Sequence, residues 1–295
     1  MIITRQIKAD LLLLLVASIW GLTFVVIKNA LDDIQPFTFN AYRFLIASIF
    51  MLLICWFNKS KFDKRLIKIG SIIGFFLFLG YTFQTVGLQY TTASNSGFIT
   101  GLAVVFVPLF ATLVIKKLPG IYSIAGAILA ALGLFFLSVD SSLTYNIGDI
   151  ITLFCAISYA IYILLLSKYC LGFDTIPLVT MQIVTVAFLS LLCSVFLESS
   201  LVSMTSSIVI ALLVCAIPAT CLAFMIQTWA QKFTTPTRTI VIITTEPVFA
   251  AIFAYMFLGE IFTSRHLFGA ALMVMGILLV EFKGETQEAV TSLDS

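Results

Sequence analysis

About ten apolar stretches, each roughly 20 residues long, follow one another along the sequence with only short polar breaks between them. A helix needs about 20 apolar residues to cross the ~30 Å hydrocarbon layer of a bilayer, so each stretch is long enough for one crossing. The chain is therefore predicted to be an all-α integral membrane protein with ten transmembrane helices. The expected spans are residues 10–30, 36–57, 69–88, 92–115, 120–139, 148–167, 176–197, 208–231, 236–258 and 264–282.

The amino-acid composition agrees with a chain that folds in lipid. Hydrophobic residues make up 61% of the 295 residues and charged residues only 10%, and the mean hydropathy is +1.15. An ordinary soluble domain carries about 25% charged residues, so a water-exposed surface cannot be built from this composition. The net charge is only +2 and no basic face is present, which argues against a nucleic-acid partner. The expected partners are the lipid bilayer and a small-molecule substrate, and a homodimer stays an open alternative.

The cysteines indicate neither a metal site nor a disulfide framework. They are scattered through apolar segments, without C-x-x-C pairs or clustered histidines. Cysteine is often fully buried in proteins, so these residues are interpreted as small core or lipid-facing groups. No metal and no cofactor are expected. The six residues are Cys55, Cys155, Cys170, Cys193, Cys215 and Cys221.

Lysine and arginine residues are concentrated on one side of the predicted membrane. The breaks on that side hold thirteen of the sixteen Lys and Arg residues, whereas the opposite side holds Lys28 and Arg265. By the positive-inside rule the basic side is cytoplasmic, which places both termini in the cytoplasm of a multi-pass protein of the cell membrane, such as a bacterial inner or plasma membrane. The first apolar run is too long for a signal peptide and is retained as a span. The polar tail, residues 284–295, is predicted to be disordered and cytoplasmic.

Two sequence segments recur at a constant distance along the chain. "QTVGLQYTT" at 84–92 returns as "QTWAQKFTT" at 227–235, and "GAILAALG" at 126–133 returns as "GAALMVMG" at 269–276, both at an offset of 143 residues. The chain is therefore predicted to consist of two five-span halves in tandem. Because five is odd, the second half must enter the membrane from the opposite side. Such inverted repeats are typical of transporters, although duplication kept only for stability is the alternative.

Several segments in both halves stand in a distinctive order and spacing. They are "SIWGLTFVVIK" (18–28), "PFTFNAYRFLIA" (36–47), "TTASNSGFITGLAVVFVPLFATL" (91–113), "TTEPVFAAIFAYMFLGE" (244–260) and the two Gly-Ala-x-Leu-x-x-x-Gly helices. By these segments the chain resembles the EamA-type branch of the drug/metabolite transporter superfamily. The resemblance covers nearly all of residues 8–283 and implies two EamA repeats, 8–142 and 146–283. It implies a membrane transporter that exports small metabolites or drug-like compounds, commonly amino acids, from a central cavity lined by both halves.

Two charged residues, Arg43 and Glu246, lie well inside predicted spans. Charges inside a membrane are costly and are a functional hypothesis by default. Pro247 follows Glu246 and leaves a backbone carbonyl unpaired, which is tolerated where protein or water satisfies it. We therefore expect Glu246 to face a wet cavity. Arg43 and Glu246 either hold the two ends of a zwitterionic substrate or form a structural pair.

Other candidate cavity residues are polar or aromatic. Trp20 lies near the middle of the first span and Tyr159 in the corresponding region of the sixth, where each forms either a pocket wall or a plain helix contact. Gln84 and Gln227 are repeat mates near span ends. They are interpreted either as groups at the mouths of the cavity or as groups that satisfy helix-end backbone.

Small residues at four-residue spacing let helices approach closely in lipid. They are expected chiefly at helix contacts, and the helix that carries Asn95 and Thr100 is expected to combine such packing with a polar wall of the cavity. The glycines assigned to packing are Gly97, Gly101, Gly126, Gly133, Gly269 and Gly276.

A membrane-embedded enzyme and a channel or assembly subunit are the alternatives to a carrier. The single histidine, His266, lies at the end of the last span, and no H-E-x-x-H or Gly-x-Ser-x-Gly motif is present, so the chain is not expected to be an enzyme. A long soluble domain and a charged pore ring are absent from the sequence, which disfavours a channel. No Walker A pattern occurs either, so ATP hydrolysis on this chain is not the expected driving force.

Overall fold

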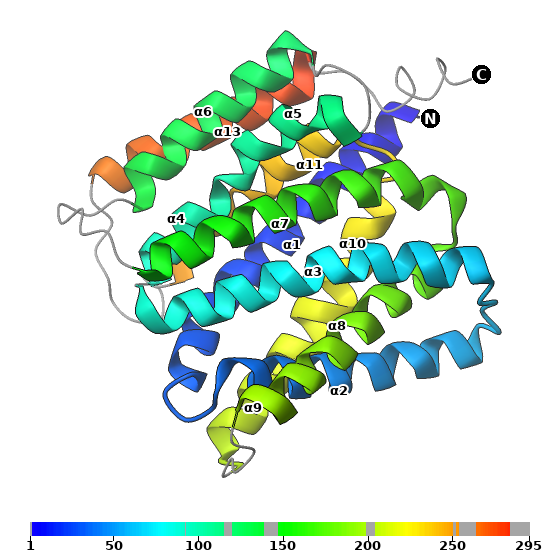
Figure 1. The fold of residues 1–295 in the computed structure, drawn as a ribbon. Coiled ribbons are helices and arrows are strands. Elements are labelled where there is room, and N and C mark those ends of the chain that lie inside the picture. The colour runs from blue at the N-terminus through cyan, green and yellow to red at the C-terminus, as the bar shows by residue number, and fades with distance from the viewer. Residues whose placement is uncertain are drawn as a thin grey trace.

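The computed structural model describes residues 2–91, 93–114, 120–138, 147–198, 204–249, 252–253 and 264–283, and the regular structure within these ranges is entirely helical (Figure 1). The predicted all-α membrane architecture is confirmed. Three shorter apolar helices lie at Ile99–Ala111, Ile121–Phe136 and Leu267–Leu279. Within the described ranges, six helices are long and apolar enough to cross a membrane: Arg5–Thr23, Pro36–Phe57, Lys64–Tyr90, Ile147–Gly172, Thr175–Leu197 and Ser206–Ala230.

Elements of the two halves follow the same order along the chain. The first half holds α1 (Ile2–Ala30), α2 (Pro36–Phe57), α3 (Lys64–Tyr90), α4 (Ala93–Gly101), α5 (Ala103–Val114) and α6 (Ile121–Ser138). The second half holds α7 (Ile147–Tyr169), the 3₁₀-helix η1 (Cys170–Gly172), α8 (Thr175–Leu197), α9 (Ser206–Ala216), the π-helix η2 (Ile217–Leu222), α10 (Ala223–Ala230), α11 (Pro236–Ile243) and α13 (Ser264–Lys283).

Local sequence signals explain several helix starts. Asp63 caps α3, because its carboxylate accepts a hydrogen bond of 2.6 Å from the Leu66 backbone N–H. Thr235 caps α11 in the same way, and Pro236 follows at the first helical position, where its missing N–H costs nothing. Pro36 occupies the corresponding position of α2. The starts of α2 at Pro36 and of α11 at Pro236 agree with the predicted beginnings of the second and ninth spans.

Two of the predicted spans are interrupted, and at equivalent positions. The span predicted at 92–115 breaks at Leu102, between α4 and α5. The span predicted at 236–258 breaks in a turn at Thr244 and Thr245, after α11. The repeat offset of 143 residues relates Leu102 to Thr245. Both halves therefore contain a discontinuous helix with its break at the same place.

The packing of the helices also follows the repeat. Helix α6 packs against α13, and α2 against α8, so each of these pairs joins a helix to its own repeat mate. Helix α3 packs against α7. In the repeat, α3 corresponds to α9 together with α10, and α7 corresponds to α1, and these mates are likewise in contact with each other. In Figure 1, α6 and α13 lie side by side along one edge of the bundle and α2 and α8 along the opposite edge. The contacts thus occur in pairs, as a pseudo-two-fold axis between the halves requires.

Glycines make the close contact of α6 with α13. A Cβ placed on Gly133 would lie 2.5 Å from the carbonyl oxygen of Gly269, and one placed on Gly276 would lie 2.7 Å from the carbonyl oxygen of Gly126. Both distances are shorter than real Cβ contacts, and the opposing atoms are backbone, which cannot move aside easily. A side chain at either position would therefore push the helices apart.

The other two glycines assigned to packing differ from each other. A Cβ on Gly101 would clash with the side chain of Leu134 on α6. A Cβ on Gly97 would meet nothing within 4 Å, and this glycine lines a cavity instead. The helix contact expected at Gly97 is therefore not made, because its open side faces empty space rather than a neighbouring helix.

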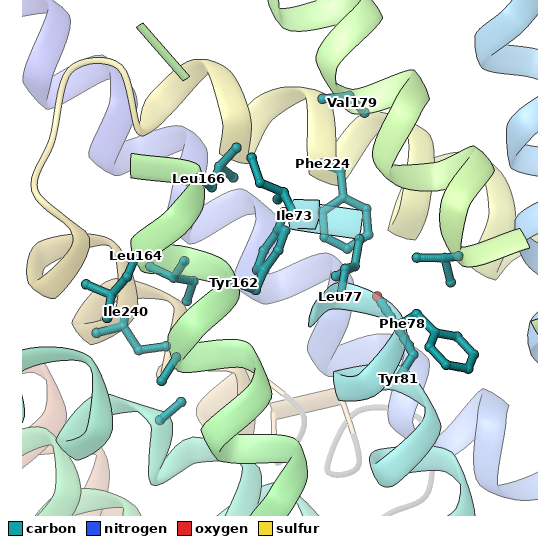
Figure 2. Close-up of a cluster of buried hydrophobic side chains, with 14 of the residues drawn as sticks. Ile73, Leu77, Phe78, Tyr81, Tyr162, Leu164, Leu166, Val179, Phe224 and Ile240 are labelled. Atoms are coloured by element: carbon teal, nitrogen blue, oxygen red, sulfur yellow. The ribbon is translucent and has the colours of Figure 1, made fainter. Parts of the chain in front are cut away.

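The largest core cluster lies where α3, α7, α8 and α10 meet. Figure 2 shows Leu77 and Tyr81 of α3 beside Tyr162 of α7 and Phe224 of α10, all of them buried. Val179 of α8 belongs to the same cluster. The core is thus assembled across the boundary between the two halves, and a cavity opens at its edge.

The end of the bundle where α1 begins is called the N-terminal face below. In Figure 1 this face is on the right, and it also carries the turn from α2 to α3, the turn from α7 to α8 and the last residues of α13. The α2–α3 turn contains Lys59 and Lys61, and both side chains are exposed. Basic residues therefore gather on the face where the chain starts.

Candidate functional site

A cavity in the bundle is lined by helices of both halves, mainly with apolar and aromatic side chains. The space between its walls is about 870 Å³, including the part that is open to the surroundings. The side chain of one predicted cavity residue, Asn95, lies outside the described residues. The other seven predicted residues all line the cavity: Trp20, Arg43, Gln84, Thr100, Tyr159, Gln227 and Glu246.

Trp20 of α1 is held by the irregular turn of η2. Its indole Nε1 donates a hydrogen bond of 2.8 Å to the carbonyl oxygen of Ala219. The N–H of Ala223, which would bond to this oxygen in an α-helix, bonds instead to the carbonyls of Pro218 and Thr220. The Ala219 oxygen thereby becomes an acceptor for a side chain of another helix. The sequence signal for this π-helix is the proline inside a span, and π-helical turns are frequent at functional sites.

Arg43 of α2 is fixed on two sides and open on a third. Its Nε donates to Thr220 Oγ1 at 2.9 Å, and its Nη2 donates to the Tyr81 hydroxyl at 3.2 Å and to the Ala219 carbonyl at 3.5 Å. The guanidinium also lies over the Tyr81 ring, 4.7 Å from its centroid. Nη1 makes no hydrogen bond to another described residue, although the side chain is only 1% exposed. A buried cation with one free edge therefore borders the cavity.

Glu246 lies directly after the break that ends α11. Helix α11 ends at Ile243, the turn at Thr244 and Thr245 follows, and Pro247 lacks the backbone N–H that an uninterrupted helix would need. The Glu246 side chain is half-buried and lines the cavity, and it forms no hydrogen bond or ion pair with a described residue. Discontinuous helices at the binding site recur in transporters.

The structure brings Arg43 and Glu246 to one cavity without joining them. Arg43 comes from the first half of the chain and Glu246 from the second, and both belong to the cavity wall. No ion pair connects them among the described residues. The structural pair weighed from the sequence stays an alternative that the double variant described below tests. The two groups can instead serve opposite charges on one ligand.

Two glutamine residues contribute the polar part of the wall. Gln84 Nε2 donates to Thr100 Oγ1 at 3.4 Å. The Tyr162 hydroxyl lies 3.2 Å from Gln182 Oε1 and 3.4 Å from Gln227 Oε1. Gln84 and Gln227 thus line the same cavity.

Aromatic rings make up much of the remaining wall. Phe224 lies 5.6 Å from Trp20, 6.2 Å from Tyr81 and 6.2 Å from Tyr162, measured between ring centroids. Tyr81 and Phe224 were not predicted as cavity residues. The repeat contained a signal, because the two are mates at the 143-residue offset and each precedes a cavity glutamine by three residues, on the same helix face.

A buried ion pair, which the sequence did not predict, lies between the cavity and the N-terminal face. Arg238 of α11 donates from Nη2 to Asp10 Oδ2 at 2.6 Å and from Nε to Asp10 Oδ1 at 3.1 Å. Both side chains are buried. Arg238 is one of the thirteen Lys and Arg residues that the sequence places on the basic side of the membrane. Nothing local in the sequence indicates that its side chain turns inward to a residue 228 positions away.

Known proteins resemble this chain over nearly its whole length. The model of the EamA-like transporter family matches twice, at residues 7–139 and 146–282. A protein of Archaeoglobus fulgidus named as an uncharacterized transporter is 40% identical over 281 residues, covering 95% of this chain and 87% of its own. The Bacillus subtilis protein YoaV, also named as an uncharacterized transporter, is 24% identical and covers 94% and 98%.

A solved crystal structure has the same fold. It superposes with a TM-score of 0.80 and covers 93% of this chain and 98% of its own, at 17% sequence identity. At this identity the likeness bears on the fold alone.

Proposed function

Because this chain belongs to the EamA-like transporter family, we propose that its cavity carries a small zwitterionic metabolite, such as an amino acid or a drug-like compound, across the cell membrane by alternating access. The chain is a multi-pass membrane protein related to transporters, and we assign the direction as export. The observation that carries the proposal is the placement of Arg43 and Glu246 in one cavity without an ion pair between them.

The charges of the wall suit a ligand with both an anionic and a cationic end. The free Nη1 edge of Arg43 is a donor for a carboxylate, and the Glu246 carboxylate is an acceptor for an ammonium group. The rings of Trp20, Tyr81 and Phe224 offer apolar surface for the rest of the molecule. A ligand that supplies both charges would neutralise two groups that are otherwise costly inside a membrane.

Alternating access is supported by the repeat. The paired helix contacts and the equivalent breaks after Gly101 and Ile243 favour two inverted five-helix repeats with ten crossings. Two such halves can exchange conformations and so expose one site to either side. The basic N-terminal face is assigned to the cytoplasm by the positive-inside rule.

The proposal is tested with the purified protein in proteoliposomes. We expect saturable uptake of at least one radiolabelled amino acid from a panel, with counterflow driven by unlabelled substrate inside. The N-acetyl and methyl ester derivatives of that amino acid, which lack the cationic and the anionic end respectively, should compete at least about tenfold more weakly. Equal competition by both derivatives would reject the charge assignment, and flux without saturation or counterflow would indicate a channel.

A further inference from the structure

The Asp10–Arg238 ion pair connects the two halves of the chain at the N-terminal face. Asp10 lies in α1, and Arg238 lies in the first turn of α11, so each side chain belongs to a helix that also lines the cavity. Two hydrogen bonds of 2.6 and 3.1 Å join the guanidinium to both carboxylate oxygens. The side chains are only 4% and 7% exposed, so the pair is shielded from water on the face where it lies.

A layer of apolar residues joins α1, α10 and α11 next to this ion pair, and one of its members, Ala9, is the sequence neighbour of Asp10. The layer is buried to at least nine-tenths and is formed where α1, α10 and α11 meet. One member, Ile243, also belongs to the cavity wall. The ion pair and the layer thus both hold α1 against α11. The residues of the layer are Ala9, Leu13, Ala230, Ile242 and Ile243.

The equivalent place at the opposite face is built differently. The acid that corresponds to Asp10 in the second half is Asp149, at the start of α7, because "AD" at 9–10 returns as "GD" at 148–149, here at an offset of 139 residues. Asp149 Oδ1 accepts a hydrogen bond of 2.6 Å from Thr91 Oγ1. The position equivalent to Arg238 at the 143-residue offset is occupied by Asn95. An acid is therefore present at both faces, but the arginine stands only at the N-terminal one.

We propose that Asp10 and Arg238 form the gate of the cavity at the N-terminal face, on the basis of the transport function proposed above. In each transport cycle the two side chains separate, α1 moves away from α11, and the cavity opens to the face where the chain begins.

The energetics of buried ion pairs favour this role over that of a simple strut. A buried ion pair often adds little net stability compared with apolar residues of the same size, whereas loss of one partner is costly. The best-attested role of a buried ion pair is to favour one structural arrangement of a protein over another. Here the pair stabilises the state that is closed at the N-terminal face and is absent from the open state. It therefore shifts the equilibrium between the closed and the open state toward the closed one.

The gate is tested by the accessibility of the cavity from the N-terminal face. A cysteine at Thr244, in a background whose six native cysteines are replaced by alanine, reports on the cavity wall. Its reaction rate with an impermeant maleimide is measured in inside-out vesicles, which expose the N-terminal face in the proposed topology. We expect Asp10→Asn and Arg238→Gln each to raise this rate by at least about tenfold, and the exchanged pair Asp10→Arg/Arg238→Asp to restore it.

Asp149→Asn is the matched control, because it removes the equivalent acid at the opposite face. It should leave the labelling rate from the N-terminal face unchanged. An unchanged rate in folded Asp10→Asn and Arg238→Gln, or an equal rise in Asp149→Asn, would overturn the proposal. The labelling needs no substrate, so it is informative even when the flux assay finds none, and failure of the proposed function is thereby distinguished from failure of the gate.

A second variant covers the case in which the single changes do not fold. In Asp10→Cys/Arg238→Cys both charges are removed together, so no unpaired charge is buried. Bridging the two thiols with a short bis-methanethiosulfonate reagent should abolish flux, and reductant should restore it. Flux that persists with an intact bridge would show that the two helices do not separate at this point, and would overturn the gate.

Discussion

At the scale of single residues, the cavity depends on how tightly each charged group is held. Arg43 has three hydrogen-bond acceptors in the surrounding helices, whereas Glu246 has no bonding partner among the described residues. The two residues should therefore respond differently to substitution, although both border the same space. We therefore expect Arg43 to matter for both the fold and transport, and Glu246 for transport alone.

We expect Glu246→Gln to keep the melting temperature of the protein and to lower the transport of a zwitterionic or cationic substrate by at least about tenfold, because the amide no longer neutralises an ammonium group. Arg43→Gln should lower both transport and melting temperature, since the Thr220 and Tyr81 hydroxyls lose a charged partner. Flux and thermal unfolding in detergent are measured for both variants and for the double variant.

The double variant distinguishes a substrate site from a hidden structural pair. Without an ion pair, the stability losses of the two single changes should add, and the double variant should be no more stable than Arg43→Gln. Recovery of stability in the double variant would show that the two charges compensate each other. Single variants with full transport would reject a substrate role for both residues.

At the scale of elements, the π-helix η2 positions side chains of α1 and α2. Pro218 has no N–H to donate, and the Ala219 oxygen accepts from Trp20 and from Arg43. Pro218→Ala permits a regular α-helix in which Ala223 bonds to Ala219, and so removes that acceptor. We expect impaired transport with little loss of thermal stability, measured as flux and melting temperature. Unchanged transport would mean that the irregular turn does not position the cavity wall.

The contact of α6 with α13 should be sensitive to any added side chain. Gly133→Leu places its side chain against the Gly269 backbone and the Met273 side chain, and should lower the melting temperature even without substrate. Gly97→Ala is the matched control, because its Cβ meets nothing within 4 Å. It should keep the melting temperature. A stable Gly133→Leu protein that has lost transport would indicate that Gly133 belongs to the substrate site and not to the helix contact.

At the scale of the whole molecule, the orientation in the membrane follows from the uneven distribution of Lys and Arg. In a cysteine-free background, a cysteine at Lys61 should react with an impermeant reagent only after the cells are lysed, whereas a cysteine at Tyr145 should react in intact cells. The reverse pattern would reject the orientation. Equal access at both positions from one side would reject the inverted repeat.

Properties that repeat along the chain were determined by the sequence alone. The apolar stretches predicted a helical membrane protein, and the 143-residue offset predicted two related halves. Seven of the eight predicted cavity residues line the cavity because charged and polar groups inside a span have few other favourable places. Membrane insertion acts on each stretch of about 20 residues, so these properties can be read locally.

Contacts between distant positions were decided only by the tertiary structure. Arg43 binds Thr220 across 177 positions of sequence, and Arg238 binds Asp10 across 228. The sequence identified Arg43 but not its partners, and assigned Arg238 to the basic surface. The direction in which a side chain points, inward to a partner or outward to water, depends on how helices from both halves are placed around it. That placement results from packing along all the helices at once, which no local pattern encodes.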